Sequence, residues 1–193
     1  MAIDVHISEF STQSGAISGL TVISPRVVTE SRGVVRELYR QSAHSGYLEG
    51  FAGRWEQINL TATRRGAVRG LHGENMNKLV TVAYGTAFGV YVDTRKDSQS
   101  AGNVVTIPLE PGVQVFVPRG VCNGFQATGA EITEYLYFFD AEWMPGMSGV
   151  ALTPLDPELH IDWPIQIEPK DRNQISEKDA NAPTLSRVMK DMA

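Results

Sequence analysis

Side chains that could perform acid–base chemistry on an anionic substrate are concentrated in one short stretch of the chain. They are Gln57, Asn59, Arg69, His72 and Lys78. An imidazole titrates near neutral pH and can act as a base, whereas guanidinium and ammonium groups bind anions such as phosphates. The stretch is therefore a candidate site. Spacing alone favours a plainer interpretation, which is a hydrogen-bonded histidine at the end of a strand.

The strand that carries Arg69 and His72 sets a geometric condition on such a site. Strict alternation of side chains places Arg69 with Leu71 on one face and His72 with Gly70 on the other. Arg69 and His72 can line one pocket only if the strand bulges or twists near Gly70, or if Arg69 reaches round an edge. Glycine is a usual bulge residue, so the sequence is compatible with a bulge there.

Short β-rich runs, separated by glycine and proline turns, must position these residues. Runs at roughly 8–12-residue spacing are typical of a sandwich or barrel. Within residues 86–95, alternation predicts that Tyr91 shares a face with Gly89 and Asp93. The clearest strands are expected at residues 78–83, 86–95, 103–109, 113–117 and 132–139, and weaker ones at 21–28, 34–40 and 55–63.

The C-terminal part of the chain differs from the rest. Helical periodicity is nearly absent before residue 140, whereas Leu185, Val188 and Met189 predict a short helix at residues 183–192. Asp-Pro and Trp-Pro pairs at residues 156–157 and 163–164 indicate a looped segment that wraps the barrel. No linker is evident, so residues 1–193 are expected to form a single domain.

Composition and charge exclude several classes of function. A net charge of −5 argues against duplex nucleic acid as a partner, because such binding surfaces are basic. Cys122 is the only cysteine, which fits a reducing compartment. Residues 1–14 contain no basic region followed by an apolar run, and no apolar stretch approaches the ~20 residues of a membrane helix. A cytoplasmic protein with no membrane partner is expected.

Several motifs follow one another along the chain. They are Arg32-Gly33 with Glu37, Gln57-Ile58-Asn59, Arg69-Gly70-Leu71-His72 with Lys78-Leu79-Val80, Val92-Asp93-Thr94-Arg95 with Ser98, Val117-Pro118-Arg119-Gly120 with Gly124-Phe125, and finally Asp156-Pro157, Ile161-Asp162-Trp163-Pro164 and Ser176-Glu177-Lys178-Asp179. One four-residue motif is weak evidence. The whole series in register resembles the dTDP-4-dehydrorhamnose 3,5-epimerase family.

The resemblance implies a fold, an assembly and a reaction. The fold is an all-β cupin barrel of the jelly-roll type, with short C-terminal helical and loop segments. The assembly is a homodimer through N-terminal strands that reach into the neighbouring subunit. The reaction inverts C3, C5 or both of a nucleoside-diphosphate 4-keto-6-deoxyhexose, with dTDP as the expected carrier and with no metal or other cofactor.

The resemblance also implies catalytic roles. His72 matches the general base, and Asp179 matches the carboxylate that orients it. Lys78 matches a lysine beside the C4 carbonyl, and Tyr137 matches the general acid on the opposite face of the sugar. Taken without the resemblance, Tyr137 is more typical of a core aromatic that shares a strand face with Tyr135, and Asp179 of a solvated charge.

The chemistry explains why these residue types are needed. The C4 ketone acidifies the hydrogens on C3 and C5. An imidazole that a carboxylate holds in one tautomer can remove such a hydrogen, and a cation or donor can stabilise the enolate oxygen. A phenol can then return a proton to the other face.

Further residues match the family's substrate contacts. Arg69 is expected near the diphosphate, whereas Arg32 and Glu37 are expected to reach the nucleotide from the partner subunit. Gln57 and Asn59 also match substrate contacts.

The chain departs from the family's pattern at four positions. Gly89 replaces an aspartate, Asn123 replaces a histidine of a pocket loop, and Val35 replaces an aromatic residue. Trp143 replaces a tyrosine that packs on the nucleobase and is still an aromatic stacker. Asn123 and Trp143 remain candidate substrate contacts. The departures put the substrate and the number of inverted centres in question more than the reaction class.

Two alternative functions stay open at this point. One is a sugar-nucleotide 3,4-ketoisomerase on the same barrel, which proton exchange at C5 would contradict. The other is a non-catalytic cupin that binds a sugar nucleotide, although such a protein needs no acid opposite a base. A metal site is not expected, because the chain has no His-x-His pair and its histidines are dispersed. His44 is expected to be exposed.

Overall fold

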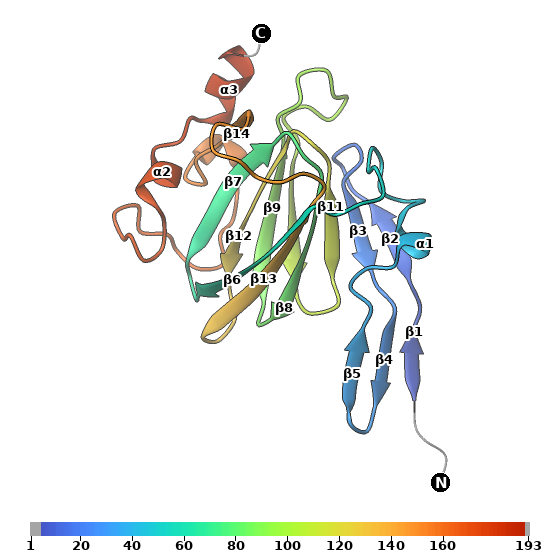
Figure 1. The fold of residues 1–193 in the computed structure, drawn as a ribbon. Coiled ribbons are helices and arrows are strands. Elements are labelled where there is room, and N and C mark those ends of the chain that lie inside the picture. Colours follow the sequence, from blue (N-terminus) through green and yellow to red (C-terminus); the bar gives the residue numbers. More distant parts are fainter. Residues whose placement is uncertain (1–4, 192–193) are drawn as a thin grey trace.

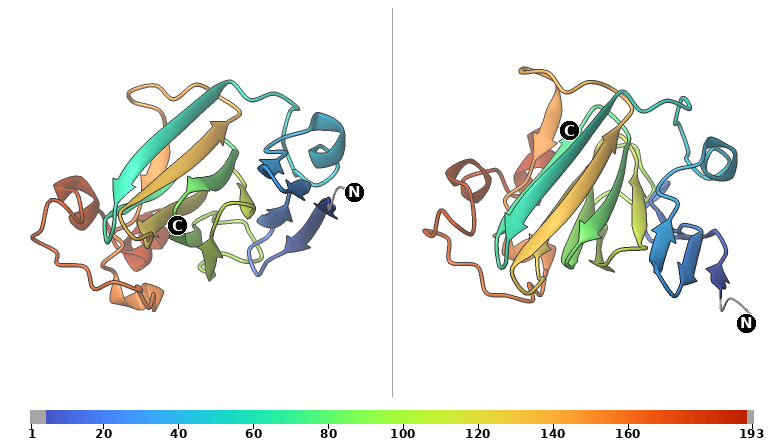
Figure 2. Two further views of the ribbon diagram at one scale, coloured as in Figure 1. Left: turned by 90° about the horizontal axis from the view of Figure 1, so that it is seen from below. Right: turned by 60° about the horizontal axis from the view of Figure 1, so that its bottom comes forward.

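The computed structural model describes residues 5–191, and antiparallel strands make up most of it (Figures 1 and 2). One sheet has the order β10 (Val104–Leu109), β9 (Ala87–Asp93), β12 (Val121–Ala127), β7 (Val68–Glu74), β14 (Gly149–Ala151). The other has the order β2 (Ser11–Ser14), β3 (Thr21–Ser24), β11 (Gln114–Val117), β8 (Lys78–Tyr84), β13 (Ile132–Phe139), β6 (Gln57–Arg64). The predicted all-β class is confirmed.

The main apolar core lies between these two sheets. It combines inward-facing side chains of both, including Val80, Val115, Tyr135, Tyr91, Phe125 and Ala127. In β9, Tyr91 belongs to this core, whereas Val90 and Val92 belong to a second cluster on the outer face. The two faces predicted for β9 are therefore confirmed, and the two sheets enclose a packed barrel.

The C-terminal segment covers the outer face of the five-stranded sheet (Figure 1). It contains η1 (Pro157–Leu159), α2 (Glu177–Ala180) and α3 (Leu185–Asp191). Leu152, Leu159 and Val188 are buried there against β9. The predicted wrapping segment and terminal helix are confirmed, although the predicted helix end at Met192 lies outside the described residues. No helix within residues 5–191 is long and apolar enough to cross a membrane.

The segment between β5 (Gly33–Arg36) and β6 covers the outer face of the six-stranded sheet. Its short helix α1 (Gln41–His44) ends at a fully buried histidine, so the expectation that His44 is exposed is wrong. The ring of His44 lies 4.9 Å from the rings of both Phe10 and Tyr39, and its Nε2 lies 3.3 Å from Gln114 Oε1. Phe10 and Gln114 are distant from His44 in the sequence, and only the fold brings them to it.

Most predicted strands are present with small changes at their ends. The five clear predictions correspond to β8, β9, β10, β11 and β13, and the weaker prediction at 55–63 corresponds to β6. The predicted strand at 21–28 is wrong as one element, because Pro25, which has no N–H, separates β3 from β4 (Val27–Glu30). The strand predicted at 34–40 is shorter in the structure, where it is β5. Strand β12 is absent from the predictions, and its Asn123 and Gly124 weaken the β pattern.

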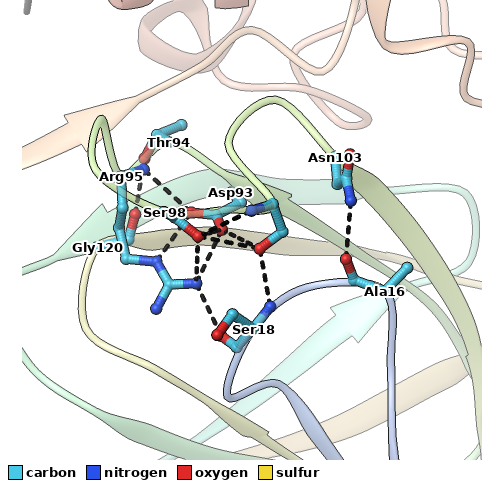
Figure 3. Close-up of polar contacts among 9 residues, drawn as sticks. Ala16, Ser18, Asp93, Thr94, Arg95, Ser98, Asn103 and Gly120 are labelled. Atoms are coloured by element: carbon cyan, nitrogen blue, oxygen red, sulfur yellow. Dashed lines mark hydrogen bonds and ion pairs between the residues drawn. The ribbon is translucent and has the colours of Figure 1, made fainter.

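A buried carboxylate ties the end of β9 to the N-terminal segment (Figure 3). Asp93 is fully buried and accepts two hydrogen bonds from the Arg95 guanidinium at 2.8 Å and one each from Ser98 and Ser100 at 2.6 Å. Arg95 also donates to the carbonyl of Ser18 at 2.7 Å. Burial raises the pKa of Asp93, but the hydrogen bonds from Arg95, Ser100 and Ser98 outweigh it and lower the pKa to about 2.

The N-terminal strands form a small separate sheet beside the barrel (Figure 1). It has the order β1 (His6–Ser8), β4, β5, and every residue of β1 and β5 is exposed. Val34 and Val35 are 43% and 64% exposed on β5. Apolar side chains on an exposed edge strand are a feature that proteins usually cover.

Candidate active site

A bulge in β7 brings Arg69 and His72 to the same cavity. His72 pairs with Asn123 and Arg69 pairs with Phe125, so β7 has one more residue than β12 between these pairs. Gly70 has a φ of +107°, and a Cβ at this position would lie 2.7 Å from the Asn123 carbonyl oxygen. Only glycine fits there. The irregularity near Gly70 that a shared pocket requires is therefore present.

His72 and Asp179 are in contact. His72 Nε2 lies 2.8 Å from Asp179 Oδ1. Asp179 is in α2, whose N-cap Ser176 accepts a hydrogen bond from the Asp179 backbone N–H. Burial raises the pKa of Asp179, but hydrogen bonds from His72 and Ser176 outweigh it and lower the pKa. Because an ionised carboxylate only accepts, Nε2 is the donor in this contact, and in the neutral imidazole Nδ1 then has the lone pair of a base.

Lys78 extends from the six-stranded sheet toward β7 and β12. Its side chain is 4% exposed. Nζ donates to the His72 carbonyl oxygen at 3.1 Å and to Asn123 Oδ1 at 2.7 Å, and it forms an ion pair with Glu74. These two hydrogen bonds and the ion pair surround the ammonium group with three oxygen atoms.

Tyr137 belongs to β13, in the sheet that faces β7. Its ring lies 4.8 Å from that of Tyr135 and stacks on Phe139 at 5.8 Å. Tyr135 is fully buried in the core, whereas Tyr137 also lines the cavity. Burial raises the pKa of the Tyr137 phenol, and Arg69 and the Thr61 hydroxyl offset only part of that effect. Tyr137 is therefore protonated at neutral pH, as a general acid must be.

These side chains surround a cavity of about 60 Å³. Two of its opposing walls come from different sheets, because His72 is on β7 and Tyr137 is on β13. The volume suits the reacting edge of a sugar ring and is far below the ~300 Å³ or more of a typical small-molecule site. The lining residues are Arg69, Gly70, His72, Glu74, Lys78, Asn123, Gly124, Tyr137 and Phe139.

Three further candidates lie beside this cavity without lining it. Strand β6 pairs with β13 so that Asn59 is next to Tyr137 and Gln57 is next to Phe139. Gln57 Nε2 donates to Asn59 Oδ1 at 3.1 Å, and Gln57 Oε1 accepts from the backbone N–H of Trp143 at 2.8 Å. Trp143 is 52% exposed, so its ring is free to meet a ligand.

Arg32 and Glu37 are not brought to the cavity. Arg32 lies at the turn between β4 and β5, where it forms an ion pair with Glu30, and Glu37 forms an ion pair with Arg40. Both belong to the N-terminal region beside the barrel. Their predicted contact is with a nucleotide bound to another subunit. A single chain does not test that contact, and it stays a prediction.

The two departures inside the barrel have different consequences. A Cβ at Gly89 would lie 2.8 Å from the Tyr91 hydroxyl and 3.0 Å from Leu109, so Tyr91 occupies the space that a larger residue at position 89 would need. Asn123 stays at the cavity wall, where its Oδ1 binds Lys78. Core side chains fill the space that the aspartate side chain would need at position 89. The change at position 123, in contrast, alters the wall of a cavity that a ligand can enter.

Glu74 is a further cavity residue that none of the sequence motifs singles out. This carboxylate lines the cavity and pairs with Lys78. The signal for it is strand alternation, because Glu74 follows His72 by two residues in β7 and so lies on the same face.

Metal-binding geometry is absent from the part of the chain that the structure describes. Within residues 5–191, no group of three or more His, Cys, Asp and Glu side chains is placed to hold a metal ion. Metal-free catalysis stays a prediction.

Sequence comparison finds relatives along nearly the whole chain. The family model described as dTDP-4-dehydrorhamnose 3,5-epimerase matches residues 14–187. The dTDP-4-dehydrorhamnose 3,5-epimerase of Salmonella typhimurium is 34% identical over 183 residues, which cover 90% of this chain and 94% of that protein. A dTDP-4-dehydro-6-deoxyglucose 3-epimerase of Streptomyces bikiniensis is 29% identical over 178 residues, or 89% of this chain and 87% of that protein.

Solved structures are similar over the same range. A 4-keto-6-deoxy sugar epimerase from the novobiocin gene cluster of Streptomyces spheroides has a TM-score of 0.85 and 28% identity, covering 96% of this chain and 92% of that one. A dTDP-6-deoxy-D-glucose-3,5-epimerase of Legionella pneumophila, solved with dTDP-4-keto-L-rhamnose, has a TM-score of 0.82 and 30% identity, covering 92% and 94%. These similarities confirm the predicted cupin-type barrel.

Proposed function

Because this chain belongs to the dTDP-4-dehydrorhamnose 3,5-epimerase family, we propose that His72, Tyr137 and Lys78 carry out its epimerisation of a dTDP-4-keto-6-deoxyhexose. The family makes the chain an isomerase that acts at C3, C5 or both. The observation that supports the assignment is a base and an acid on opposite walls of one small cavity. Inversion needs such a pair, since the proton leaves one face of the carbon and returns to the other.

His72 is the base in this proposal. Its Nδ1 takes a proton from a carbon next to the C4 ketone, and the electrons of the broken C–H bond form the enolate. Asp179, 2.8 Å from Nε2, holds the tautomer and stabilises the imidazolium that results. Such base catalysis contributes typically 10²–10⁴-fold, as an order of magnitude.

Lys78 stabilises the enolate oxygen in this proposal. Three oxygen atoms already surround its Nζ in the free chain, so the substrate oxygen must replace one of them. Asn123 is the acceptor most easily replaced, because its amide is neutral, whereas Glu74 is charged and the His72 carbonyl is fixed in the backbone. The displaced amide can then turn its N–H group toward a sugar oxygen.

Tyr137 completes the inversion in this proposal. Its phenol gives a proton to the face of the carbon opposite His72, which leaves a phenolate on the tyrosine and a protonated imidazole. The raised pKa of the phenol makes the phenolate a strong base, so it recovers a proton readily. A cavity that excludes most water prevents the enolate from being quenched at random.

The nucleotide must lie outside the small cavity. Arg69 lines both this cavity and a neighbouring one of about 420 Å³, to which Arg64 and Arg172 also contribute. Guanidinium groups suit phosphate oxygens, so the diphosphate is expected beside Arg69. The exposed ring of Trp143 offers a surface for the nucleobase.

A homodimer through the N-terminal strands is part of the proposal. Val34 and Val35 on β5, with Ile58 and Leu60 on edge strand β6, leave apolar surface exposed in the single chain. A partner chain would cover these edges and bring Arg32 toward a second site. Sedimentation at micromolar concentration should give a dimer, and a monomer would contradict the role of Arg32 in trans.

One experiment tests the function as a whole. The enzyme is incubated with dTDP-4-keto-6-deoxyglucose in deuterated water, and NMR identifies which carbons exchange and which invert. Exchange with inversion at C3 or C5 supports the proposal and identifies the centres. Migration of the ketone without exchange at C5 would favour the 3,4-ketoisomerase, and the absence of any exchange would favour a binding protein.

A further inference from the structure

Glu74 is a carboxylate inside the catalytic cavity that the mechanism above does not use. It lies at the end of β7, on the same face as His72, and lines the cavity. Its side chain is 21% exposed, and its ion-pair partner Lys78 is 4% exposed. A carboxylate this close to the reacting atoms needs a reason to be there, because burial of a charge costs free energy unless a partner compensates.

The surroundings of Lys78 supply that reason. Removal from water disfavours an ammonium ion and favours the neutral amine. Its other two acceptors, the His72 carbonyl oxygen and the Asn123 amide oxygen, are neutral. Glu74 therefore provides the negative charge that compensates the ammonium group.

The remaining ionisable groups around Lys78 do not supply a negative charge. Strand β7 contributes Arg69 and His72, and β13 contributes the protonated phenol of Tyr137. Strand β12 contributes the thiol of Cys122, whose pKa burial raises to about 12, so the thiol is neutral. Asp179 contacts His72 through the imidazole, where its charge serves the base.

We propose that Glu74 is a positioning residue that keeps Lys78 in its ammonium form and aims it at the C4 oxygen of the substrate. The inference rests on the proposed function, because it presumes that Lys78 meets the enolate oxygen. Without Glu74, Lys78 would become a neutral amine at a lower pH, and a neutral amine stabilises an enolate less than an ammonium ion does.

The test compares Glu74→Gln with Glu74→Asp, which keeps the charge on a shorter stem. Glu134→Gln is the matched control, since Glu134 is a carboxylate on β13 that does not line the cavity. Deuterium exchange into dTDP-4-keto-6-deoxyglucose is measured across a range of pH. In parallel, ¹³C NMR of lysine-labelled protein follows the Lys78 ε-carbon, assigned with Lys78→Met among Lys78, Lys96, Lys170, Lys178 and Lys190.

The expected result is a coupled shift. In Glu74→Gln, the Lys78 resonance titrates at a lower pH and the alkaline limb of the rate profile moves down with it, by ~1–3 pH units for the loss of a neighbouring opposite charge. Glu74→Asp gives a smaller shift, and Glu134→Gln gives none. The NMR signal is needed because Glu74 also interacts electrostatically with His72 and Tyr137, so the rate profile alone does not isolate Lys78.

A different pattern would overturn the inference. If Glu74→Gln lowers the rate equally at every pH and leaves the Lys78 resonance unmoved, Glu74 only maintains the shape of the cavity. If the wild-type enzyme shows no exchange at all, the proposed function fails instead. The NMR titration still decides in that case whether Glu74 governs the protonation of Lys78.

Discussion

Replacement of Tyr137 by phenylalanine should separate the two proton transfers that inversion requires. The substitution keeps a ring that packs 4.8 Å from Tyr135 and stacks on Phe139, and it removes only the hydroxyl. His72 and Asp179 are on the opposite wall and stay intact, so the enolate should still form. Loss of the acid should lower net product by ~10²–10⁴-fold, which corresponds to about 3–5 kcal/mol in the barrier.

The assay records deuterium content and configuration at C3 and C5 together, by NMR of dTDP-4-keto-6-deoxyglucose in deuterated water. In Tyr137→Phe, the deuteron should come back mostly from His72, on the face from which the proton left. Deuterium should therefore enter the sugar with little inversion. This separation of exchange from inversion is a result that a merely structural tyrosine would not produce.

Tyr135→Phe is the matched control. Tyr135 is fully buried, and within residues 5–191 its hydroxyl makes no hydrogen bond of good geometry, so its removal should cost little. If both variants keep full inversion, Tyr137 is a packing residue and the acid lies elsewhere. If exchange and inversion fall together in Tyr137→Phe, the phenol assists enolate formation and the assigned roles are wrong.

Three further predictions concern the base, the acid stability and the metal. His72→Ala should lower turnover by at least ~100-fold in a protein whose circular dichroism and melting are unchanged, and unaltered turnover would remove His72 from the mechanism. The pKa of Asp93 is about 2 in the folded chain against an ordinary 3.8, so its charge should stabilise the fold by about 2 kcal/mol above about pH 4 and progressively less as the pH falls toward 2. Asp93→Asn should reduce the melting temperature at neutral pH and flatten its acid dependence, and an unchanged pH profile would contradict this. Dialysis against EDTA should leave activity intact, whereas a loss that a divalent ion restores would require a metal site.

Local pattern in the sequence is sufficient for most of the barrel. Strands such as β9 and β13 alternate between core and surface, and this period of two follows from the backbone of an extended chain. Helical spacing of Leu185 and Val188 likewise predicts the terminal helix. Prediction from alternation fails at Pro25, where the single predicted strand is divided into β3 and β4, and at β12, where Asn123 and Gly124 obscure the alternation.

The candidate site depends on contacts between residues far apart in the chain. From the sequence alone, His72 is a residue that could act as a base, and Tyr137 is more typical of the core. Only the family's motifs suggest that His72 pairs with Asp179. The tertiary structure brings Asp179 to 2.8 Å from His72 across 107 positions, and places Tyr137 on the facing wall of the same cavity.

The sequence by itself therefore determined the class of fold, the strand faces and the residue types available for catalysis, because these depend on local spacing and side-chain chemistry. Only the tertiary structure decided that a bulge at Gly70 turns Arg69 and His72 to one side, that Tyr91 fills the space at Gly89, and that Glu74 meets Lys78. The bulge depends on how β7 pairs with β12, the packing of Tyr91 on how the core is filled, and the contact of Glu74 with Lys78 on how the two sheets approach each other. Such approach is set by packing over the whole core, which no short stretch of sequence records.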